Sequence, residues 1–546
     1  MNNPPRTAPE LEPMPSFDAF DALPEHEETI ILPGSTTTAT LEYAHLLHGV
    51  LEISRAAERI QPYIKETPLQ PSPRLSSITG NNVYFKREDH QAIHSFKIRG
   101  ALNKLLQLTD EERAKGVMAA SAGNHAQGVA KGAKLLGIEA RVVMPETTPD
   151  VKVEAVKSLG AEVVPFGDNF GDAYEHAMRL LEDTEQTFIH PFDDMDVIHG
   201  QGTIGLEVLK QNPDVDIVFI PGGGGGLAAG MAKAIKALKP STKVVVVEPE
   251  GSNAIQRAVQ AGKPVKMPEP PDIFADGVAV SQVGELTFTE IRRYVDDIIT
   301  VGEDEICVAI SDFWQETGDT LEGAGALAEA GLKKYVQEMG IKDQNLVAVT
   351  SGSNISAPKL RKALERAEIV AAREAFFSVR LPEEAGSLRQ FCKSIVDGHN
   401  ITEFHYRRSN AVDAHILIAF AMKDDHDKEN FLSKMHMQGY DSDDFTDDDF
   451  VKDHLRHLGG GRGDSSLEEE LYVIDLPERS GALSEFLDTL EDRWNISLFH
   501  YRSFGGETSR VLIGFETNDS QALQSTFDQG GYGHQRVVSG AVKLFL

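Results

Sequence analysis

Hydrophobic and polar positions follow one repeating order between about residues 46 and 365. Short apolar runs, rich in β-branched residues, alternate with longer segments in which apolar residues recur every three or four positions. The short runs are typical of buried strands, and the longer period is typical of amphipathic helices. A chain that keeps this order predicts βαβ units, and hence an α/β fold in which helices cover both faces of a mostly parallel sheet.

This pattern predicts individual elements. Strands are expected at residues 83–86, 117–120, 140–144, 161–164, 216–220, 243–247 and 346–349, and helices at 125–136, 150–159 and 173–181. In open parallel sheets, ligands bind at the loops that follow the carboxyl ends of the strands. We therefore expect the functional residues in those loops.

A different pattern begins after residue 373, where the chain repeats itself. Residues 377–388 return as residues 472–483, and 472 − 377 = 95. The same offset, without a gap, matches the FHYR segments at 404–407 and 499–502. A duplicated domain follows, and the order of elements in each copy fits a βαββαβ sandwich. The histidine and arginine of each FHYR segment either contact a ligand or are ordinary strand-face residues.

Charge and composition narrow the class of protein. The 85 acidic residues outnumber the 53 lysines and arginines, so the net charge is −32. Such an acidic surface disfavours nucleic acid and anionic membranes as partners. The two cysteines, Cys307 and Cys392, lack metal-ligand spacing, so we predict no metal. No apolar run approaches the roughly 20 residues that span a bilayer, so no membrane segment is expected.

The N-terminal stretch predicts a disordered acidic tail. Residues 1–45 are rich in proline and acidic residues, and Arg6 is the only lysine or arginine among them. Targeting presequences are basic instead. We therefore expect a cytoplasmic protein, with an organelle as the alternative.

A lysine follows the first predicted strand. The segment His94 to Ala101 places Lys97 at the start of an amphipathic helix. The positive end of a helix and nearby buried surface both disfavour the charged form of a lysine. A neutral lysine can form an imine with a carbonyl compound. The alternative is a solvated helix lysine, and this segment taken alone favours it.

Two further loops offer backbone N–H groups to an anion. Residues 121–126 join a strand to a helix, and their small side chains leave the backbone free to bind a carboxylate or phosphate. Asn124 adds an amide donor, and His125 is either a general base or a structural histidine. Residues 221–227 place five glycines between another strand and helix. That loop lacks the P-loop and dinucleotide motifs, so it suits a monophosphate.

The last loop, residues 350–354, contains a serine. Ser351 can make one neutral hydrogen bond to a ligand, or it can cap a helix that begins near Ala357. A lysine, a phosphate-binding glycine run, an amide and a hydroxyl on separate loops of one sheet together describe a site for an aldehyde cofactor.

Four motifs, in this order and spacing, resemble those of a known family. They are SFKIRG at 95–100, SAGNHAQG at 121–128, GGGGL at 223–227 and SGSN at 351–354. From about Thr67 to its C-terminus, the chain resembles the fold-type II pyridoxal-phosphate enzymes, whose fold is tryptophan synthase β-like. Among these it is similar to the biosynthetic threonine dehydratases.

The resemblance implies a domain organisation and a reaction. The parts would be the tail (1–45), a catalytic domain (46–368) and two ACT-like α+β regulatory modules (374–450 and 469–546). The reaction would be β-elimination of L-threonine to 2-oxobutanoate and ammonia, and also of L-serine to pyruvate, in isoleucine biosynthesis. Isoleucine and valine would be allosteric effectors, and the assembly would be a homotetramer. The alternatives are racemisation or β-replacement in a specialised pathway, and a non-catalytic amino-acid sensor.

By motif position, the resemblance also implies residue roles. Lys97 would be the Schiff-base lysine of pyridoxal 5'-phosphate, and Ser351 would meet the pyridine nitrogen. The other roles would be Phe96 beside the ring, Asn124 at the ring oxygen, Gly223, Gly224, Gly225, Gly226 and Leu227 at the phosphate, and Ser121, Ala122, Gly123, Asn124 and His125 at the substrate.

The chain departs from the family's usual sequence at several positions. These are Gly222, Gly318-Asp319, the loop Glu322-Gly323-Ala324-Gly325 and Ser356-Ala357. Three of these four changes lie on or near the site, and all three make it looser, so we predict a less rigid site with altered specificity or reduced turnover.

Overall fold

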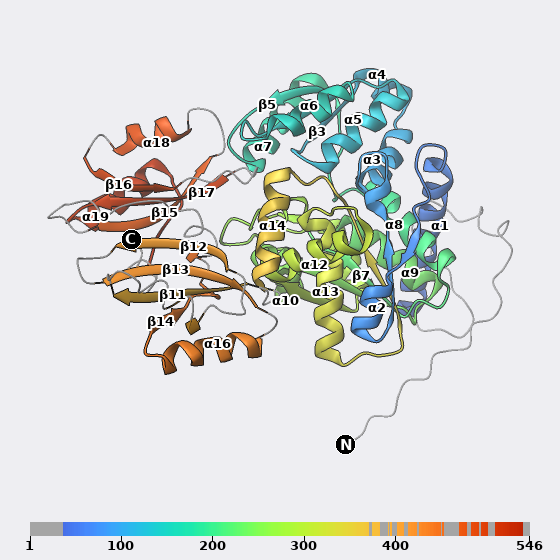
Figure 1. Cartoon of the computed structure of the whole chain (residues 1–546). Helices are drawn as coiled ribbons and strands as arrows, with labels where there is room; N and C mark the ends of the chain where they lie inside the picture. The colour runs from blue at the N-terminus through green and yellow to red at the C-terminus, as the bar shows by residue number, and fades with distance from the viewer. Residues whose placement is uncertain are drawn as a thin grey trace. The chain divides into compact units, whose positions relative to one another are not determined.

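The computed structural model describes residues 37–370 and most of the strands and helices that follow (Figure 1). Beyond residue 370, the described residues are 374–382, 391, 394–395, 401–408, 413–422, 425–448, 450–451, 469–477, 482–490, 493–500 and 508–538. Helix α1 (Thr37–Ile60) begins inside the predicted disordered tail, so residues 37–45 are helical instead. The rest of the tail lies outside the described residues.

Six strands form the larger sheet of the α/β region, which we define as residues 49–370. Their order is β1-β2-β10-β7-β8-β9. Strand β1 is antiparallel to β2, and the other neighbouring pairs are parallel. The strands are β1 Leu69–Pro71, β2 Asn82–Lys86, β7 Ile217–Pro221, β8 Lys243–Pro249, β9 Asp297–Val301 and β10 Asn345–Val349. The predicted strands at 83–86, 216–220, 243–247 and 346–349 are confirmed to within a few residues.

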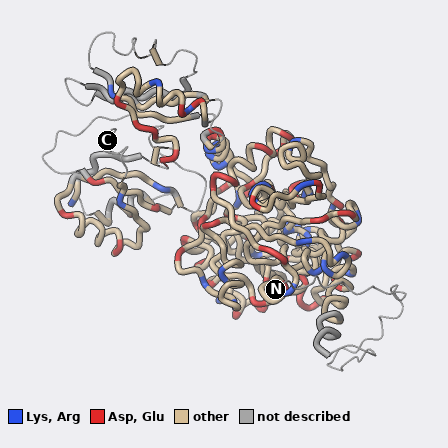
Figure 2. Tube along the Cα trace, turned by 90° about the horizontal axis from the view of Figure 1, so that it is seen from below, with Lys and Arg blue, Asp and Glu red and all other residues tan. Residues whose placement is uncertain are grey.

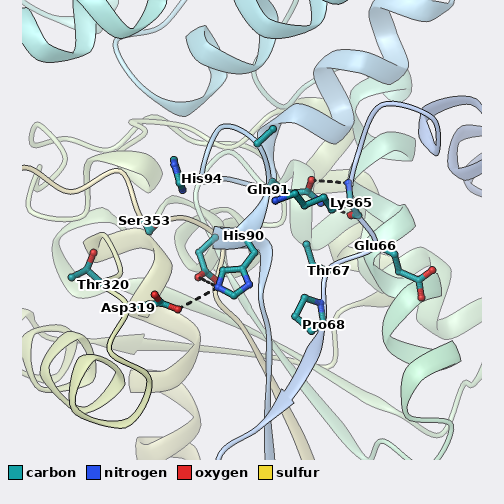
Figure 3. Close-up of a pocket in the computed structure, with 12 residues that line it drawn as sticks. Lys65, Glu66, Thr67, Pro68, His90, Gln91, His94, Asp319, Thr320 and Ser353 are labelled. Atoms are coloured by element: carbon teal, nitrogen blue, oxygen red, sulfur yellow. Dashed lines mark hydrogen bonds and ion pairs between the residues drawn. The ribbon is translucent and has the colours of Figure 1, made fainter.

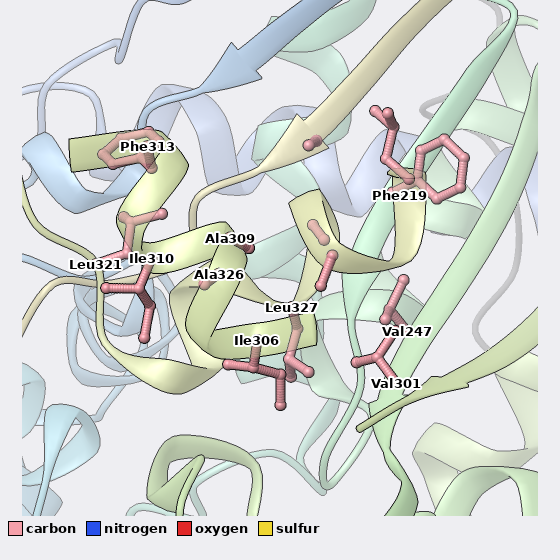
Figure 4. Close-up of a cluster of buried hydrophobic side chains, with 14 of the residues drawn as sticks. Phe219, Val247, Val301, Ile306, Ala309, Ile310, Phe313, Leu321, Ala326 and Leu327 are labelled. Atoms are coloured by element: carbon pink, nitrogen blue, oxygen red, sulfur yellow. The ribbon is translucent and has the colours of Figure 1, made fainter. Parts of the chain in front are cut away.

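Helices cover both faces of this sheet. They are α2 Pro73–Thr79, α8 Met195–Gln211, α9 Gly226–Leu238, α10 Ala254–Ala261, α11 Glu285–Tyr294, α12 Glu303–Thr317, α13 Gly323–Met339 and α14 Ala357–Val370. On β7, Phe219 packs with α12 and α13, whereas Val218 and Ile220 pack with α8 and α9. Figure 4 shows the first cluster, with Phe219 and Val247 of the sheet beside these helices. Because both faces are buried, the central strands β7, β8 and β10 are apolar over most of their length, whereas the edge strands β1 and β9 are only partly buried.

A second, smaller sheet has four parallel strands in the order β5-β4-β3-β6. Its strands and helices are β3 Val117–Ala120, β4 Ala140–Met144, β5 Glu162–Pro165, β6 Thr187–Phe188, α3 Lys97–Leu106, α4 Asp110–Lys115, α5 Asn124–Leu136, α6 Asp150–Ser158 and α7 Phe170–Thr184. Helices α3, α5 and α6 pack on one face and α7 on the other. The expectation that all candidate loops lie on one sheet is therefore wrong, because β3 pairs within this smaller sheet.

The duplication predicted after residue 373 is confirmed by the element bounds. Strands β11 and β15 begin 95 residues apart (469 − 374 = 95), as do β13 and β17 (508 − 413 = 95). The strand orders are β12-β13-β11-β14 and β16-β17-β15-β18. The elements are β11 Glu374–Pro382, β12 Ile401–Arg408, β13 Asp413–Ala421, α16 Asp425–Met437, β14 Asp441–Asp444, β15 Glu469–Pro477, α18 Ala482–Leu490, β16 Asn495–His500, β17 Thr508–Glu516, α19 Ser520–Gly530 and β18 His534–Arg536.

The second copy has the full βαββαβ order that the sequence predicted. Both copies also carry a register irregularity at the same place, between Ile401 and Glu403 and between Ile496 and Leu498. Arg502 of the second FHYR segment lies outside the described residues. A ligand role for these segments therefore stays a prediction.

Acidic and basic residues are interspersed along the α/β region (Figure 2), although the whole chain is strongly acidic. The effect of charge on a site must therefore be judged from its immediate neighbours. Of the helices that the structure describes, none is both long and apolar enough to cross a membrane.

Candidate active site

Lys97 lies where two loops at the carboxyl edge of the larger sheet are joined. It is the first residue of α3, and the loop before it follows β2. The backbone N–H of Phe96 donates to the Ser351 carbonyl oxygen (3.1 Å), and Ser95 forms an antiparallel bridge with Gly352. This pairing brings Lys97 and Ser351, which are far apart in the sequence, into one site.

The Lys97 amine is partly buried and lies close to an aromatic ring. Its Nζ donates to the carbonyl oxygen of Pro191 (2.7 Å) and lies 5.4 Å from the centre of the Phe96 ring. Burial lowers the pKa of Lys97 to about 8, although the charge of Glu322 opposes the shift. About a tenth of the amine is therefore neutral at pH 7, which favours the imine-forming interpretation of Lys97 over the solvated helix lysine.

The glycine run, Gly222 to Gly226, joins β7 to α9. Gly225 has a φ of +93°, a left-handed conformation that disfavours side chains. Within the described residues, the backbone N–H groups of Gly223 to Leu227 have no hydrogen-bond acceptor. Free N–H groups at the start of a helix bind anions. The run is therefore a cradle of the kind that a phosphate requires.

Neighbouring side chains leave no room for anything but glycine in this run. A Cβ atom at Gly224 would collide with the ring of Phe192, and one at Gly223 would lie 2.8 Å from Val278 Cα. The Thr287 hydroxyl donates to the Gly224 carbonyl oxygen (2.7 Å) and so fixes the peptide. The cradle is held in shape by packing as well as by backbone preference.

A loop that the sequence analysis missed, residues 189–193, lies between the lysine and the glycine run. Ile189 contacts His125, Pro191 accepts from Lys97, and Phe192 covers Gly224. Asp193 accepts backbone N–H groups from the first turn of α11. The sequence signal was weak, because the loop follows β6, a strand of only two residues.

Asn124 begins α5, on the smaller sheet, and reaches two residues of the larger one. Its Nδ2 donates to Glu322 Oε1 (2.6 Å), and its Oδ1 accepts from Asn354 Nδ2 (2.7 Å). The site therefore lies between the two sheets. The sequence analysis named the loop that carries Glu322 as a departure from the family's sequence, but it gave Glu322 itself no role.

The rest of the loop 121–125 divides into an open part and a buried part. Ser121 Oγ accepts the N–H of Gly123 (3.2 Å), and the space beside Gly123 is open for 4 Å. Ala122 is half-buried in the same turn. His125 is buried with its Nε2 against the Ile189 carbonyl oxygen (2.8 Å). Burial, and then the charge of Lys97, lower the pKa of His125 to about 3, which favours the structural interpretation over a general base.

Ser351 is buried, and its Oγ donates to the Ala324 carbonyl oxygen at 3.2 Å. The alternative that Ser351 caps the next helix is wrong. Helix α14 is capped by Ser356, whose Oγ accepts the N–H of Lys359 (3.5 Å) and whose carbonyl accepts the N–H of Leu360 (2.9 Å).

Packing or backbone conformation accounts for two of the unusual glycines, Gly222 and Gly318. The space where Gly222 would carry a side chain is filled by Val246, Glu248 and Ile255. Gly318 ends α12 with a φ of +76°, which suits glycine. Gly323 is the first residue of α13, a position that accepts proline in other helices. The prediction of a less rigid site stays a prediction.

A cavity of about 650 Å³ is lined in part by the loop that precedes Lys97 (Figure 3). Asp89, His90 and Asp319, which line it, place ligand-type atoms within 4.8 Å of one another. Each of these atoms also contacts Arg87 NH2, at 2.7, 2.7 and 2.5 Å respectively. A guanidinium at the centre of the cluster already neutralises the carboxylates, so we interpret it as an ion-pair network.

Two family models match the chain. Residues 60–352 match the model described as "Pyridoxal-phosphate dependent enzyme". Residues 365–455 and 460–541 match "C-terminal regulatory domain of Threonine dehydratase". The matches therefore cover both the α/β region and the repeated region.

Curated relatives and solved structures agree with these matches. The biosynthetic L-threonine dehydratase IlvA of Burkholderia multivorans is 44% identical over 497 residues, covering 89% of this chain and 97% of that protein. The Escherichia coli IlvA is 43% identical over 500 residues, covering 91% and 97%. The processed threonine deaminase isoform 2 of Solanum lycopersicum has a TM-score of 0.57 at 42% identity, covering 63% and 99%. Maize serine racemase has a TM-score of 0.55 at 34% identity, covering 58% and 96%.

Proposed function

The chain belongs to the pyridoxal-phosphate-dependent threonine dehydratases, and we propose that it converts L-threonine to 2-oxobutanoate and ammonia. The observation that carries this proposal is the extent of the likeness, which runs through both the α/β region and the repeated region. The similarity to serine racemase covers a smaller share of the chain. L-serine, which also carries a β-hydroxyl, would be a second substrate and would give pyruvate.

The residues present fit the cofactor. The glycine run offers free N–H groups to a phosphate, the Lys97 amine is partly neutral, and Ser351 and Asn124 supply polar groups between them. When bound, pyridoxal phosphate supplies an aldehyde that condenses with amines and a ring that stabilises negative charge at the substrate's α carbon. We assign the phosphate to residues 223–227 and the ring to Phe96, Asn124 and Ser351.

Lys97 would move the α proton of the substrate. Its pKa of about 8 lets the amine accept a proton near neutral pH and return it afterwards. Threonine would lose its β-hydroxyl as water, and one water molecule would be added later as ammonia is released. The overall products are therefore 2-oxobutanoate and ammonia. The open space beside Gly123 would accept the substrate carboxylate on the backbone N–H groups of residues 121–125.

Ser351 would bind the pyridine nitrogen without a charge. Its 3.2 Å hydrogen bond to Ala324 is long, so the hydroxyl can turn towards the ring at little cost. A neutral hydroxyl, unlike a carboxylate, does not force a proton onto that nitrogen. A pyridine ring without that proton withdraws electrons less strongly. It would therefore favour prompt loss of the β-hydroxyl over a long-lived carbanion.

The repeated region would regulate this reaction. We propose that isoleucine inhibits and valine activates the enzyme, which would place it at the first step of isoleucine biosynthesis. We also propose a homotetramer in the cytoplasm. Some plant relatives are named chloroplastic, so an organelle is the alternative location.

The test is to supply purified protein with pyridoxal phosphate, record its visible absorbance, and then add L-threonine. The expected result is a cofactor band, followed by 2-oxobutanoate that is measured with a coupled dehydrogenase. Lys97→Ala should lose both signals, whereas Lys134→Ala, on the same region's surface, should keep them. Racemised serine without any 2-oxo acid would contradict the proposal.

A further inference from the structure

The Asn124 carboxamide is held from both sides. One N–H donates to Glu322 Oε1 (2.6 Å), and the amide oxygen accepts from Asn354 Nδ2 (2.7 Å). Asn354 Nδ2 in turn donates to the Ile93 carbonyl oxygen (2.8 Å), so its own position is fixed. A primary amide has two N–H donors, and this network uses one of them. The second N–H remains available to a ligand.

Glu322 is held in place by its surroundings. The residue is 5% exposed, and it occupies the N-cap position of α13 without a capping hydrogen bond from its side chain. The two glycines Gly277 and Gly352 lie against the carboxyl group, and a Cβ atom at Gly352 would collide with Oε1. The Glu322 N–H also donates to the Gly352 carbonyl oxygen (3.2 Å). Backbone and side chain are therefore both fixed against the loop that carries Ser351.

We propose that Glu322 is a positioning residue that acts through Asn124. By accepting one amide N–H, its carboxylate aims the other N–H at the ring oxygen of bound pyridoxal phosphate. The opposite amide orientation would set the Asn124 oxygen against the carboxylate and its NH₂ group against that of Asn354. Both contacts would be repulsive, so one orientation is enforced. This inference rests on the proposed function, which supplies the ring oxygen.

The protonation state of Glu322 determines whether the Asn124 carboxamide is restricted to one orientation. Burial and then the charge of Asp276 raise the pKa of Glu322 to about 7, while the bond from Asn124 and the charges of Lys152 and Lys359 oppose the rise. Lys97 also interacts with its charge. A carboxylate accepts only the amide N–H, whereas a protonated carboxyl can donate to the amide oxygen. The enforced orientation therefore belongs to the ionised form, above about pH 7.

Four variants separate this role from a structural one. Glu322→Gln keeps an oxygen acceptor but removes the titration, and Glu322→Leu removes both. Asn124→Ala and the double variant Glu322→Leu/Asn124→Ala test whether the two residues act together. The matched control is Glu329→Leu, because Glu329 of α13 is also a buried glutamate with a pKa raised, chiefly by burial, to about 8.

The measurements are the dissociation constant of pyridoxal phosphate and the pH dependence of its visible absorbance, made on the full chain. Glu322→Leu should weaken cofactor binding about tenfold or more. The double variant should bind no more weakly than Asn124→Ala alone, because Glu322 acts through the amide. Glu322→Gln should keep most of the affinity and lose the absorbance change near pH 7. The control should match the wild type in both.

Additive losses in the double variant would overturn the proposal, as would wild-type affinity in Glu322→Leu. Circular dichroism shows whether Glu322→Leu folds. If it does not, the decisive variant is Glu322→Gln, and a pH dependence of its absorbance equal to that of the wild type would overturn the proposal. A wild type that binds the cofactor but makes no 2-oxobutanoate would refute the proposed function alone, since the binding measurements still test Glu322.

Discussion

Glu329 is expected to destabilise this protein at neutral pH. It lies in the middle of α13, is 1% exposed, and its Oε2 has no hydrogen-bond partner among the described residues. Lys333 Nζ is 3.9 Å from Oε1, but the same amine lies 2.7 Å from Asp312 Oδ2. Burial raises the pKa of Glu329 to about 8; Lys333 opposes the rise, whereas Asp312 and Glu316 add to it. The carboxyl group is thus predominantly neutral in the folded chain at pH 7.

The magnitude follows from linkage. In the unfolded chain the group ionises near the ordinary glutamate pKa of 4.5, and in the folded chain its pKa is about 8. The free energy of unfolding, as far as it depends on Glu329, is therefore highest below pH 4.5. It falls as the pH rises and stops falling above about pH 8. At 1.36 kcal/mol per pH unit, the loss at pH 7 is about 3 kcal/mol, and at pH 5 it is below about 1 kcal/mol.

The perturbation is Glu329→Leu, and the assay is urea unfolding at pH 5 and pH 7. The chain has two tryptophans. In a Trp494→Phe background, Trp314 of α12 reports on the helix that packs beside α13. Glu329→Leu should raise the free energy of unfolding relative to the parent protein. This gain should be about 2 kcal/mol larger at pH 7 than at pH 5.

The control is Thr79→Val. The buried Thr79 hydroxyl donates to the Leu75 carbonyl oxygen (2.8 Å), so loss of this uncharged bond should destabilise the chain by a similar amount at both pH values. If Glu329→Leu changes the unfolding free energy equally at both pH values, the carboxyl group does not titrate as the structure implies, and the reasoning fails.

Three further predictions concern the site. Lys152→Ala should move the Glu322-dependent change in cofactor absorbance to higher pH, because the charge of Lys152 opposes the rise in the pKa of Glu322; an unshifted midpoint would contradict this. Gly224→Ala should weaken pyridoxal-phosphate binding about tenfold or more by colliding with Phe192, and adding Phe192→Ala should restore part of the affinity in the same titration. In cofactor-free protein, the rate of cofactor attachment to Lys97 should rise about tenfold per pH unit and level off above pH 8, since burial lowers the pKa of that amine to about 8; a rate still rising at pH 9.5 would refute the shift.

The sequence alone determined the local elements and the duplication. The strands Val117–Ala120 and Ala140–Met144 have the predicted bounds. Each is a short apolar run between polar turns, and such a run is readily assigned as a buried strand. The second copy repeats the first without a gap, so the 95-residue spacing of β11 and β15 could be counted directly (469 − 374 = 95). The loops that hold Lys97, Asn124, the glycine run and Ser351 could be found because each follows a predicted strand.

Only the tertiary structure decided how these loops meet. Strand pairing is a long-range choice that periodicity does not encode, so the division into two sheets, with Asn124 on one and Lys97 and Ser351 on the other, could not be predicted. Glu322 and the loop 189–193 were missed for the same reason. A buried acid or a covering phenylalanine acquires its role from neighbours far along the chain, and burial and charge pairing exist only once those neighbours are in place.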